Sequence, residues 1–364
     1  MNKLFKILSV GFLSTSLLTA CAQSSATNKE TNVKTENLSL EEITNKAKEE
    51  GEVASVGMPD SWANWGETWK ELDSEYNLKH KDTDMSSAEE LAKFESEGKN
   101  ATADIGDVGI NFGPLAKEKG LTLPYKTSYW DDVPDWAKDD EGHWILGYTG
   151  TIAFLTDKNN VKNPPKTWDD LLNGDYKVAI GDVTKGTQSQ FAVLAAAMAN
   201  GGDEKDIEPG LEYFDKIAKQ GRLSSVDSSI ANLEKGEIDV AVVWDFNGLN
   251  YRDQIDKDRF EVSIPEDASV VSGYTTVINK NAKHPHAAML AREYILSDEG
   301  QINLARGYAR PIRDNVELPA DVQEKVLPKE QYENAKPVED FKAWDETAKQ
   351  LPQLWQEKVL IHVK

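Results

Sequence analysis

Short apolar segments alternate with amphipathic helical segments along most of the chain, and this alternation limits the folds that the chain can adopt. The runs ADIGDV at 103–108 and IDVAVVW at 238–244 are typical of buried strands, and the first is followed by residues with helical periodicity. Repeated strand–helix units favour an α/β fold with a largely parallel sheet. We expect strands at 52–57, 78–84, 103–108, 148–156, 177–181, 238–244 and 273–278, and helices at 38–50, 62–76, 87–97, 112–119, 166–172, 188–200, 210–219, 230–235, 285–296, 298–307 and 337–358.

The first 21 residues have the pattern of an export signal. Lys3 precedes an apolar run at 7–18, which is too short to span a bilayer, and the run ends in small residues before Cys21. This segment resembles a bacterial lipobox, in which the cysteine is lipidated and becomes the first residue of the mature protein. The alternative is an ordinary secretory signal with a chance cysteine. Residues 22–37 are almost all polar and predict a flexible tether.

Length and composition narrow the range of functions. The 344 residues that follow position 20 are too many for one compact core and predict two domains. A net charge of −22 repels nucleic acid, so we expect no nucleic-acid partner. Cys21 is the only cysteine, so the chain can form neither an internal disulfide nor a thiolate metal site once that residue is lipidated. We expect no cofactor and a monomeric protein.

Four segments together resemble the extracellular solute-binding proteins of ABC importers. They are ADIGDVG at 103–109, GYTGTIAFLTDK at 147–158, NPPKTWDDLL at 163–172 and YTTVINKNAK at 274–283. The branch they resemble is the type II group, which holds polyamine, thiamine, ferric-iron and phosphonate or sugar-phosphate receptors. The resemblance implies a two-lobed α/β fold of the periplasmic-binding-protein type. Hinge strands join its lobes, a small solute binds between them, and the permease subunits of an importer are its partners.

The resemblance also suggests lobe boundaries, and the N-terminal segment suggests a location. We expect one lobe at 38–150 and 276–315, and the other at 151–275 and 316–364. The tether and the lipid anchor together favour the extracellular face of a bacterium with a single membrane, and a periplasmic lipoprotein is the alternative.

Candidate binding residues follow the predicted strands, because ligands of open α/β sheets sit beyond the carboxyl ends of strands. In the loop at 181–189, a lysine, a glycine and hydroxyls lead into a long helix, which suits a phosphate or carboxylate group. The alternative is a surface loop that caps the helix and binds no ligand. Tryptophans can stack on a ligand or simply pack a helix, and Ser86 can cap a helix or bind an anion. The candidates are Ser61, Trp62, Ser86, Tyr148, Lys185, Gly186, Thr187, Trp244, Asp245 and Tyr274, with Asp227 and Arg310 as weaker ones.

The nature of the solute stays open between two classes. The loop around Lys185 favours a phosphorylated, phosphonate or other anionic compound. Asp245 and the tryptophans instead suit a polyamine or thiamine-type cation, although Tyr274 occupies the position where polyamine receptors carry an acid. We expect no enzymatic activity, because neither a zinc-protease pair of histidines nor a G-x-S-x-G motif is present. A cell-surface adhesin or scaffold is the alternative from a different class.

Overall fold

The computed structural model describes residues 38–363. The predicted signal segment, Cys21 and the tether lie outside the described residues. None of the helices within 38–363 combines the length and the apolar character that crossing a membrane requires.

The described strands form one mixed sheet in the order β2-β1-β3-β9-β4-β7-β5-β6, with three short strands added at its sides. The strands are β1 Glu52–Val56, β2 Lys79–Thr83, β3 Ile105–Gly109, β4 Trp144–Asp157, β5 Val178–Ala179, β6 Leu223–Ser224, β7 Val240–Trp244, β8 Phe260–Ser263, β9 Ser269–Ile278, β10 Arg310–Pro311 and β11 Ala335–Pro337. The two longest strands, β4 and β9, run antiparallel to each other and to their other main neighbours. The expectation of a largely parallel sheet is therefore wrong, and the parallel pairs lie on either side of these two crossing strands.

Helices cover the two ends of this sheet and make two lobes. Around β1, β2 and β3 lie α1 Leu40–Glu50, α2 Trp65–Tyr76, α3 Ser87–Glu97, α4 Phe112–Glu118, α10 Pro285–Leu296 and α11 Asp298–Arg306, which we call the N-lobe. Around β5 to β8 lie α5 Trp168–Asn173, α6 Thr187–Ala199, α7 Glu208–Lys219, α8 Ile230–Glu234, α9 Asp245–Ile255 and α13 Phe341–Lys358, which we call the C-lobe. The short α12 Ala320–Gln323 packs on α11.

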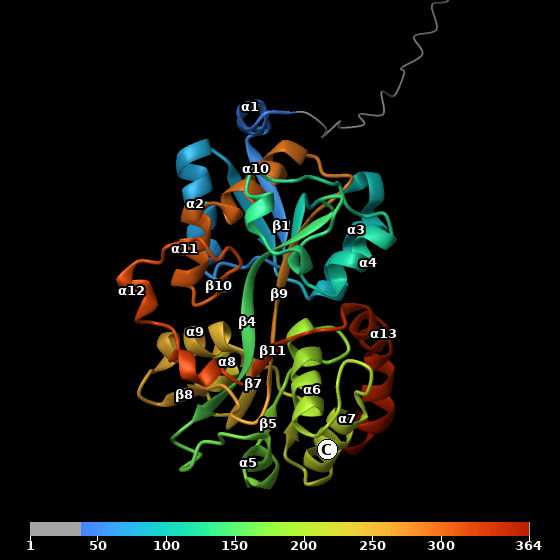
Figure 1. The fold of residues 1–364 in the computed structure, drawn as a ribbon, viewed down its shortest axis with the longest axis vertical. Helices are drawn as coiled ribbons and strands as arrows, with labels where there is room; N and C mark the ends of the chain where they lie inside the picture. Colours follow the sequence, from blue (N-terminus) through green and yellow to red (C-terminus); the bar gives the residue numbers. More distant parts are fainter. Residues whose placement is uncertain (1–37, 364) are drawn as a thin grey trace, which may run out of the picture. The chain divides into compact units, whose positions relative to one another are not determined.

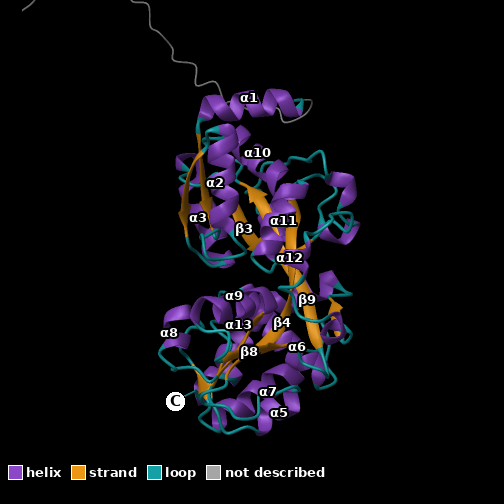
Figure 2. Ribbon diagram, turned by 90° about the vertical axis from the view of Figure 1, so that its left-hand side faces the viewer, coloured by secondary structure: helices purple, strands orange, loops and turns teal. Residues whose placement is uncertain are grey.

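Two strands connect the lobes. Residues 144–151 of β4 pair with β9, and residues 152–157 pair with β7 and β8, so one strand belongs to both ends of the sheet. Figures 1 and 2 show β4 and β9 running side by side from the N-lobe to the C-lobe. All fourteen residues of β4 are buried, as expected for a central strand that is covered on both faces. The predicted α/β class with hinge strands between two lobes is confirmed, and the residue boundaries of the lobes stay a prediction.

Local sequence signals account for most of the helix boundaries. Ser39 caps α1, and Glu42 completes the capping box, as the spacing of the two residues predicts. Two helices, Ser87–Glu97 and Pro285–Leu296, begin and end at the predicted residues. α2 begins at Trp65 and not at residue 62, because Ala63 and Asn64 have φ angles of 47° and 61°, which a right-handed helix cannot contain.

Candidate functional site

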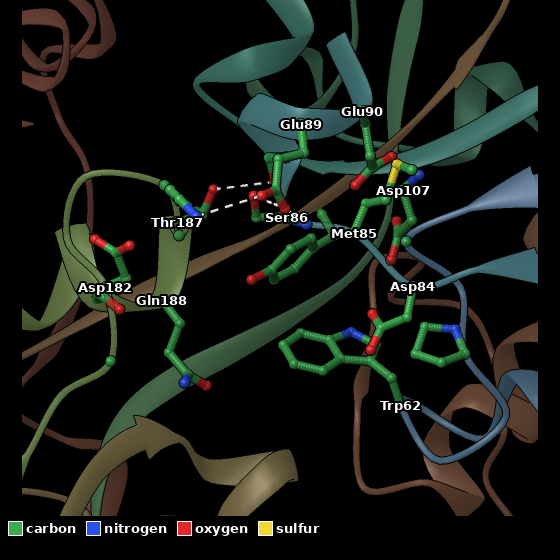
Figure 3. Close-up of a pocket in the computed structure, with 18 of the residues that line it drawn as sticks. Trp62, Asp84, Met85, Ser86, Glu89, Glu90, Asp107, Asp182, Thr187 and Gln188 are labelled. Atoms are coloured by element: carbon green, nitrogen blue, oxygen red, sulfur yellow. Dashed lines mark hydrogen bonds and ion pairs between the residues drawn. The ribbon is translucent and has the colours of Figure 1, made fainter. Parts of the chain in front are cut away.

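A pocket of about 430 Å³ lies between the lobes, at the carboxyl ends of strands from both of them. This volume is in the range of sites that bind small molecules. The N-terminus of α3 enters the pocket from the N-lobe, and the N-terminus of α6 enters it from the C-lobe (Figure 3). The lining residues are Gly57, Pro59, Trp62, Asp84, Met85, Ser86, Ser87, Glu89, Glu90, Asp107, Gly181, Asp182, Lys185, Gly186, Thr187, Gln188, Ser189, Asp227 and Tyr274.

The N-terminus of α3 is closed by its own side chains. Ser86 is the N-cap residue, and its backbone N–H and hydroxyl donate to Glu89 Oε2 at 3.1 and 2.8 Å. These hydrogen bonds lower the pKa of Glu89, so its carboxylate keeps a negative charge at the helix end. Ser87 is the first residue of α3, and its Oγ accepts a hydrogen bond from the Gly109 N–H at 3.0 Å.

The N-terminus of α6 carries no side-chain cap. Its N-cap residue is Gly186, so the N–H groups of the first turn, at residues 187–189, are left without a capping side chain. Gln188 holds this end of the helix in place, because its Oε1 accepts from Trp244 N and Asn247 Nδ2, both at 2.9 Å. Lys185 Nζ lies 3.4 Å from Glu89 Oε1 of the other lobe, and its side chain is about half exposed. Backbone N–H groups at such a terminus bind anions.

The two lobes touch beside the pocket. Thr187, the first residue of α6, lies against Gly109 at the end of β3, where a Cβ atom would come within 2.0 Å of the threonine Oγ1. Asn111 Nδ2 donates to Gln190 Oε1 at 3.1 Å. At the opposite side of the lobes, Asn250 Nδ2 donates to the carbonyl oxygen of Ser61 at 2.6 Å. Only a glycine at position 109 leaves room for this approach.

Buried carboxyl groups form the N-lobe wall of the pocket. Glu90 fits between two glycines, Gly57 and Gly106, where a Cβ atom would lie 2.3 and 2.7 Å from its oxygens. Its Oε2 accepts from the Asp107 N–H at 3.1 Å. Burial raises the pKa of both Glu90 and Asp107 well above the usual carboxyl range, and the charge of Asp107 adds to the shift of Glu90. This wall therefore attracts protons or other cations.

Aromatic residues orient one of these carboxyl groups. Trp62 Nε1 donates to Tyr148 Oη, and Tyr148 Oη donates to Asp107 Oδ2, each at 2.6 Å. The ring of Trp62 meets the ring of Tyr274 edge to face, with centroids 5.4 Å apart. Trp244 Nε1 in turn lies 3.2 Å from Tyr274 Oη. These contacts fix Trp62 and Tyr274 on the pocket surface.

The structure brings six of the ten predicted binding residues to this pocket. They are Trp62, Ser86, Lys185, Gly186, Thr187 and Tyr274. Tyr148 and Trp244 are fully buried behind the lining, where they support Asp107 and Tyr274.

The two remaining predicted residues lie outside the lining. Ser61 is exposed at the lobe contact with Asn250. Asp245 begins α9 and is buried, where its carboxylate accepts from Thr151 N and Tyr332 Oη, both at 2.8 Å. Arg310 lies 3.8 Å from the same carboxylate. Asp245 therefore joins parts of the fold, and its oxygens already have partners.

Sequence reasoning missed much of the acidic wall. Asp84, Glu90 and Asp107 come from a strand end, a helix and a strand interior that no local pattern connects. Asp227, considered as a weaker candidate, does line the pocket. The one available signal was Asp107 within the apolar run 103–108, since a charged residue inside a buried strand is rarely tolerated without a role.

Comparisons with known proteins agree with this architecture. Residues 100–347 match the family model described as bacterial extracellular solute-binding protein. The sulfate-binding protein of Escherichia coli K12 is 27% identical over 277 residues, which cover 70% of this chain and 76% of that protein. Among solved structures, the periplasmic binding protein AfuA of Actinobacillus pleuropneumoniae, with fructose-6-phosphate bound, superposes with a TM-score of 0.71 at 17% identity, covering 84% of this chain and 98% of that one.

A periplasmic thiamin binding protein superposes with a TM-score of 0.68 at 20% identity, covering 85% of this chain and 96% of that one. These structures share the two-lobed fold, and the predicted resemblance to solute-binding proteins of ABC importers is confirmed. The family match spans well over half of the chain and includes the crossing strands and the N-terminus of α6. The chain belongs to the bacterial extracellular solute-binding proteins.

Proposed function

We propose that this protein captures a small organic solute with an anionic group in the pocket between its lobes and delivers it to the permease of an ABC importer. The observation that carries the proposal is the uncapped N-terminus of α6, which directs the N–H groups of residues 187–189 at the pocket. The positive end of the helix dipole and the neighbouring Lys185 add to the attraction for an anion.

The relatives support an anionic solute without identifying it. One relative is named a sulfate-binding protein and another, also from Escherichia coli, a thiosulfate-binding protein, at 27% and 25% identity. The pocket of about 430 Å³ is far larger than an inorganic anion needs, so we infer that an organic group fills the remaining space.

A cationic solute of the polyamine or thiamine type is the second candidate. It is favoured by the lining, in which six carboxyl groups face a single lysine. Asp245 contributes nothing to this alternative, because its oxygens are used within the fold.

We further propose that Cys21 carries a lipid anchor that keeps the receptor close to its importer. Substituting Cys21→Ala should move the protein from the membrane fraction to the soluble fraction and abolish its labelling by an alkyne-tagged fatty acid. Labelling that persists in Cys21→Ala would show that the lipid is attached to another residue. Size-exclusion chromatography coupled to light scattering would check the expected monomer.

Thermal shift measurements on residues 38–364 test the binding function. A solute that binds the native state raises the melting temperature, so a panel of organic phosphates, phosphonates, sulfonates, sulfate and polyamines separates the two classes. Small-angle scattering should show compaction with the compound that binds, because the crossing strands β4 and β9 let the lobes close. Binding without any change in size would contradict the closure.

A single substitution tests the anion site. Lys185→Ala should weaken the binding of ethyl phosphate by about tenfold, roughly 1.4 kcal/mol, because the cation beside the helix terminus is lost. Lys162→Ala, at an exposed position outside the pocket, makes the same change in net charge and should leave the affinity unchanged. Equal binding by Lys185→Ala and the wild type would remove Lys185 from the site.

A further inference from the structure

Among the residues that the structure describes, most carboxyl groups of the pocket have no cation beside them. The single lysine, Lys185, already lies 3.4 Å from Glu89. Two of the six carboxyl groups have local roles, since Glu89 caps α3 and Asp182 accepts from the Thr184 N–H and hydroxyl at 2.9 and 2.6 Å. The remaining four are Asp84, Glu90, Asp107 and Asp227.

One carboxylate oxygen of Asp107 lacks a well-formed hydrogen bond to the described residues. The residue is only 2% exposed and lines the pocket. Its Oδ2 accepts from Tyr148, whereas Oδ1 makes no hydrogen bond of good geometry within the described residues, although the indole N–H of Trp65 lies close enough to lower the pKa of Asp107. A buried carboxylate oxygen without a donor is costly, so a donor supplied by the solute explains the arrangement. Figure 3 shows Asp107 beside Glu90 and across the pocket from Thr187 and Gln188.

Like charges face each other across the lobes in the same region. Asp84 follows β2 of the N-lobe, and Asp227 lies in the loop between β6 and α8 of the C-lobe. Burial raises the pKa of Asp84, and the charges of Asp227 and Glu89 raise it further. Two carboxylates brought together by lobe closure repel each other, and a positive charge between them reverses the sign of that interaction.

Aromatic rings complete this side of the pocket. Trp62 and Tyr274 both line it and pack edge to face, with ring centroids 5.4 Å apart. A cation is attracted to the face of an aromatic ring, most strongly to that of tryptophan.

We propose that the solute is a zwitterion, whose cationic group is held by Asp84, Asp107 and Asp227 while its anionic group binds the N-terminus of α6. The inference rests on the proposed function, since α6 provides the anionic half. It also accounts for both classes of ligand that the sequence leaves open: each class matches one half of the pocket. Closure is then coupled to the complete solute, because only the cation relieves the repulsion between the lobes.

Titration calorimetry with matched compounds tests the inference. Phosphoethanolamine and taurine carry both charges, ethyl phosphate and ethanesulfonate carry the anion alone, and ethanolamine carries the cation alone. We expect at least one zwitterion to bind 10 to 100 times more tightly than its anionic partner and than ethanolamine, a difference typical of a buried, charge-assisted contact. An anion-only compound that binds as tightly as its zwitterion would overturn the inference and leave the proposed function intact.

Two further outcomes separate the inference from the proposed function. If ethanolamine binds as tightly as phosphoethanolamine, the anion site at α6 is wrong, and the proposed function in its anionic form fails with it. If Ca²⁺ or Mg²⁺ alone raises the melting temperature as much as the zwitterions do, the carboxyl groups form a metal site and the inference is overturned.

Variants assign the effect to the acidic wall. Asp107→Asn and Asp227→Asn should each remove most of the 10- to 100-fold preference for the zwitterion while leaving the affinity for ethyl phosphate unchanged. Asp227 is exposed on a loop, so its variant stays informative if Asp107→Asn folds poorly. Asp131→Asn, at an exposed N-lobe position outside the pocket, is the matched control and should keep the preference. If both single variants, Asp227→Asn and Asp107→Asn, keep the full preference for the zwitterion, the assignment is contradicted.

Discussion

The N-termini of α3 and α6 face each other in the same pocket, but they differ in their capping residues and in their charge. α3 has a complete capping box and carries the negative charge of Glu89 at its end, whereas α6 begins at a glycine without a side-chain cap. The charge of Glu89 therefore opposes an anion at the first turn of α3, whereas the N–H groups at the start of α6 are available to a ligand.

Giving α6 the cap that α3 has should produce the largest effect. Gly186 has φ −100° and ψ 129°, the usual N-cap conformation, and a Cβ atom there would meet its nearest neighbours at 3.4 and 3.5 Å. Gly186→Asp should therefore fold normally and stabilise the protein by about 0.5 to 1 kcal/mol. It should weaken ethyl phosphate binding about 100-fold, roughly 2.7 kcal/mol, because a carboxylate then occupies the N–H groups.

The uncharged cap is the control for this substitution. Gly186→Ser competes for the same N–H groups without adding charge, and we expect it to weaken binding by no more than about tenfold. Chemical denaturation and calorimetry measure the two effects independently. Unchanged affinity in Gly186→Asp would show that the anion binds elsewhere in the pocket.

A substitution at the contact between the lobes should have the next largest effect. Gly109→Ala places a Cβ atom 2.0 Å from Thr187 Oγ1, so α6 can no longer approach β3 as closely. If binding requires closure, affinity should fall about 30-fold, close to 2 kcal/mol, and by the same factor for ethyl phosphate and phosphoethanolamine. Small-angle scattering should show reduced compaction. A loss restricted to one of the two compounds would mean that Gly109 acts on one end of the pocket and not on closure.

The sequence predicts the binding residues at the start of α6 better than it predicts the acidic wall of the pocket. A glycine, hydroxyls and a lysine before a long helix form a local pattern, and the structure places Lys185, Gly186 and Thr187 in the pocket. Asp84, Asp107 and Asp227 are 23 or more positions apart in the sequence, and only the packing of three strands and the approach of two lobes brings them together. No periodicity or capping rule contains that information.

The difference between local signals and long-range contacts also explains the errors in the predicted fold. Helices with a capping box or a clear apolar stripe were located to within a few residues, as for α1, α3 and α10. The direction of β4 and β9 depends on how the chain crosses between the lobes, which apolar content does not encode. The sequence predicts no helix at 245–255, whereas α9 begins at Asp245 directly after β7 and buries its carboxylate.

The two ends of the pocket should also differ in their response to pH. Burial raises the pKa of Asp107 and Glu90, so in the free protein these groups keep their protons to a higher pH than usual. A bound cation lowers both pKa values, and binding is therefore coupled to proton release. Taurine affinity should rise with pH, by up to about tenfold per unit for each proton released, until the pH exceeds the pKa values of the free protein.

Ethanesulfonate provides the comparison for this pH dependence. Its charge is constant in this range and it reaches only the α6 end of the pocket, so its affinity should stay nearly constant. Calorimetry in buffers of different ionisation enthalpy would count the protons released. A taurine affinity that falls as pH rises would contradict a cation site at these carboxyl groups.

Removing the negative charge at the N-terminus of α3 should give the smallest effect. It makes this terminus more like that of α6. Glu89→Gln keeps a side chain that can complete the capping box, so the free energy of unfolding should fall by no more than about 1 kcal/mol. The substitution removes the negative charge that lies 3.4 Å from Lys185 Nζ. The anion then no longer competes with Glu89 for the lysine. Ethyl phosphate affinity should increase about threefold, a size typical of an exposed ion pair. Since both side chains are about half exposed, high salt should screen the gain, and a gain that persists in 1 M NaCl would mean that Glu89 acts through the geometry of α3 and not through its charge.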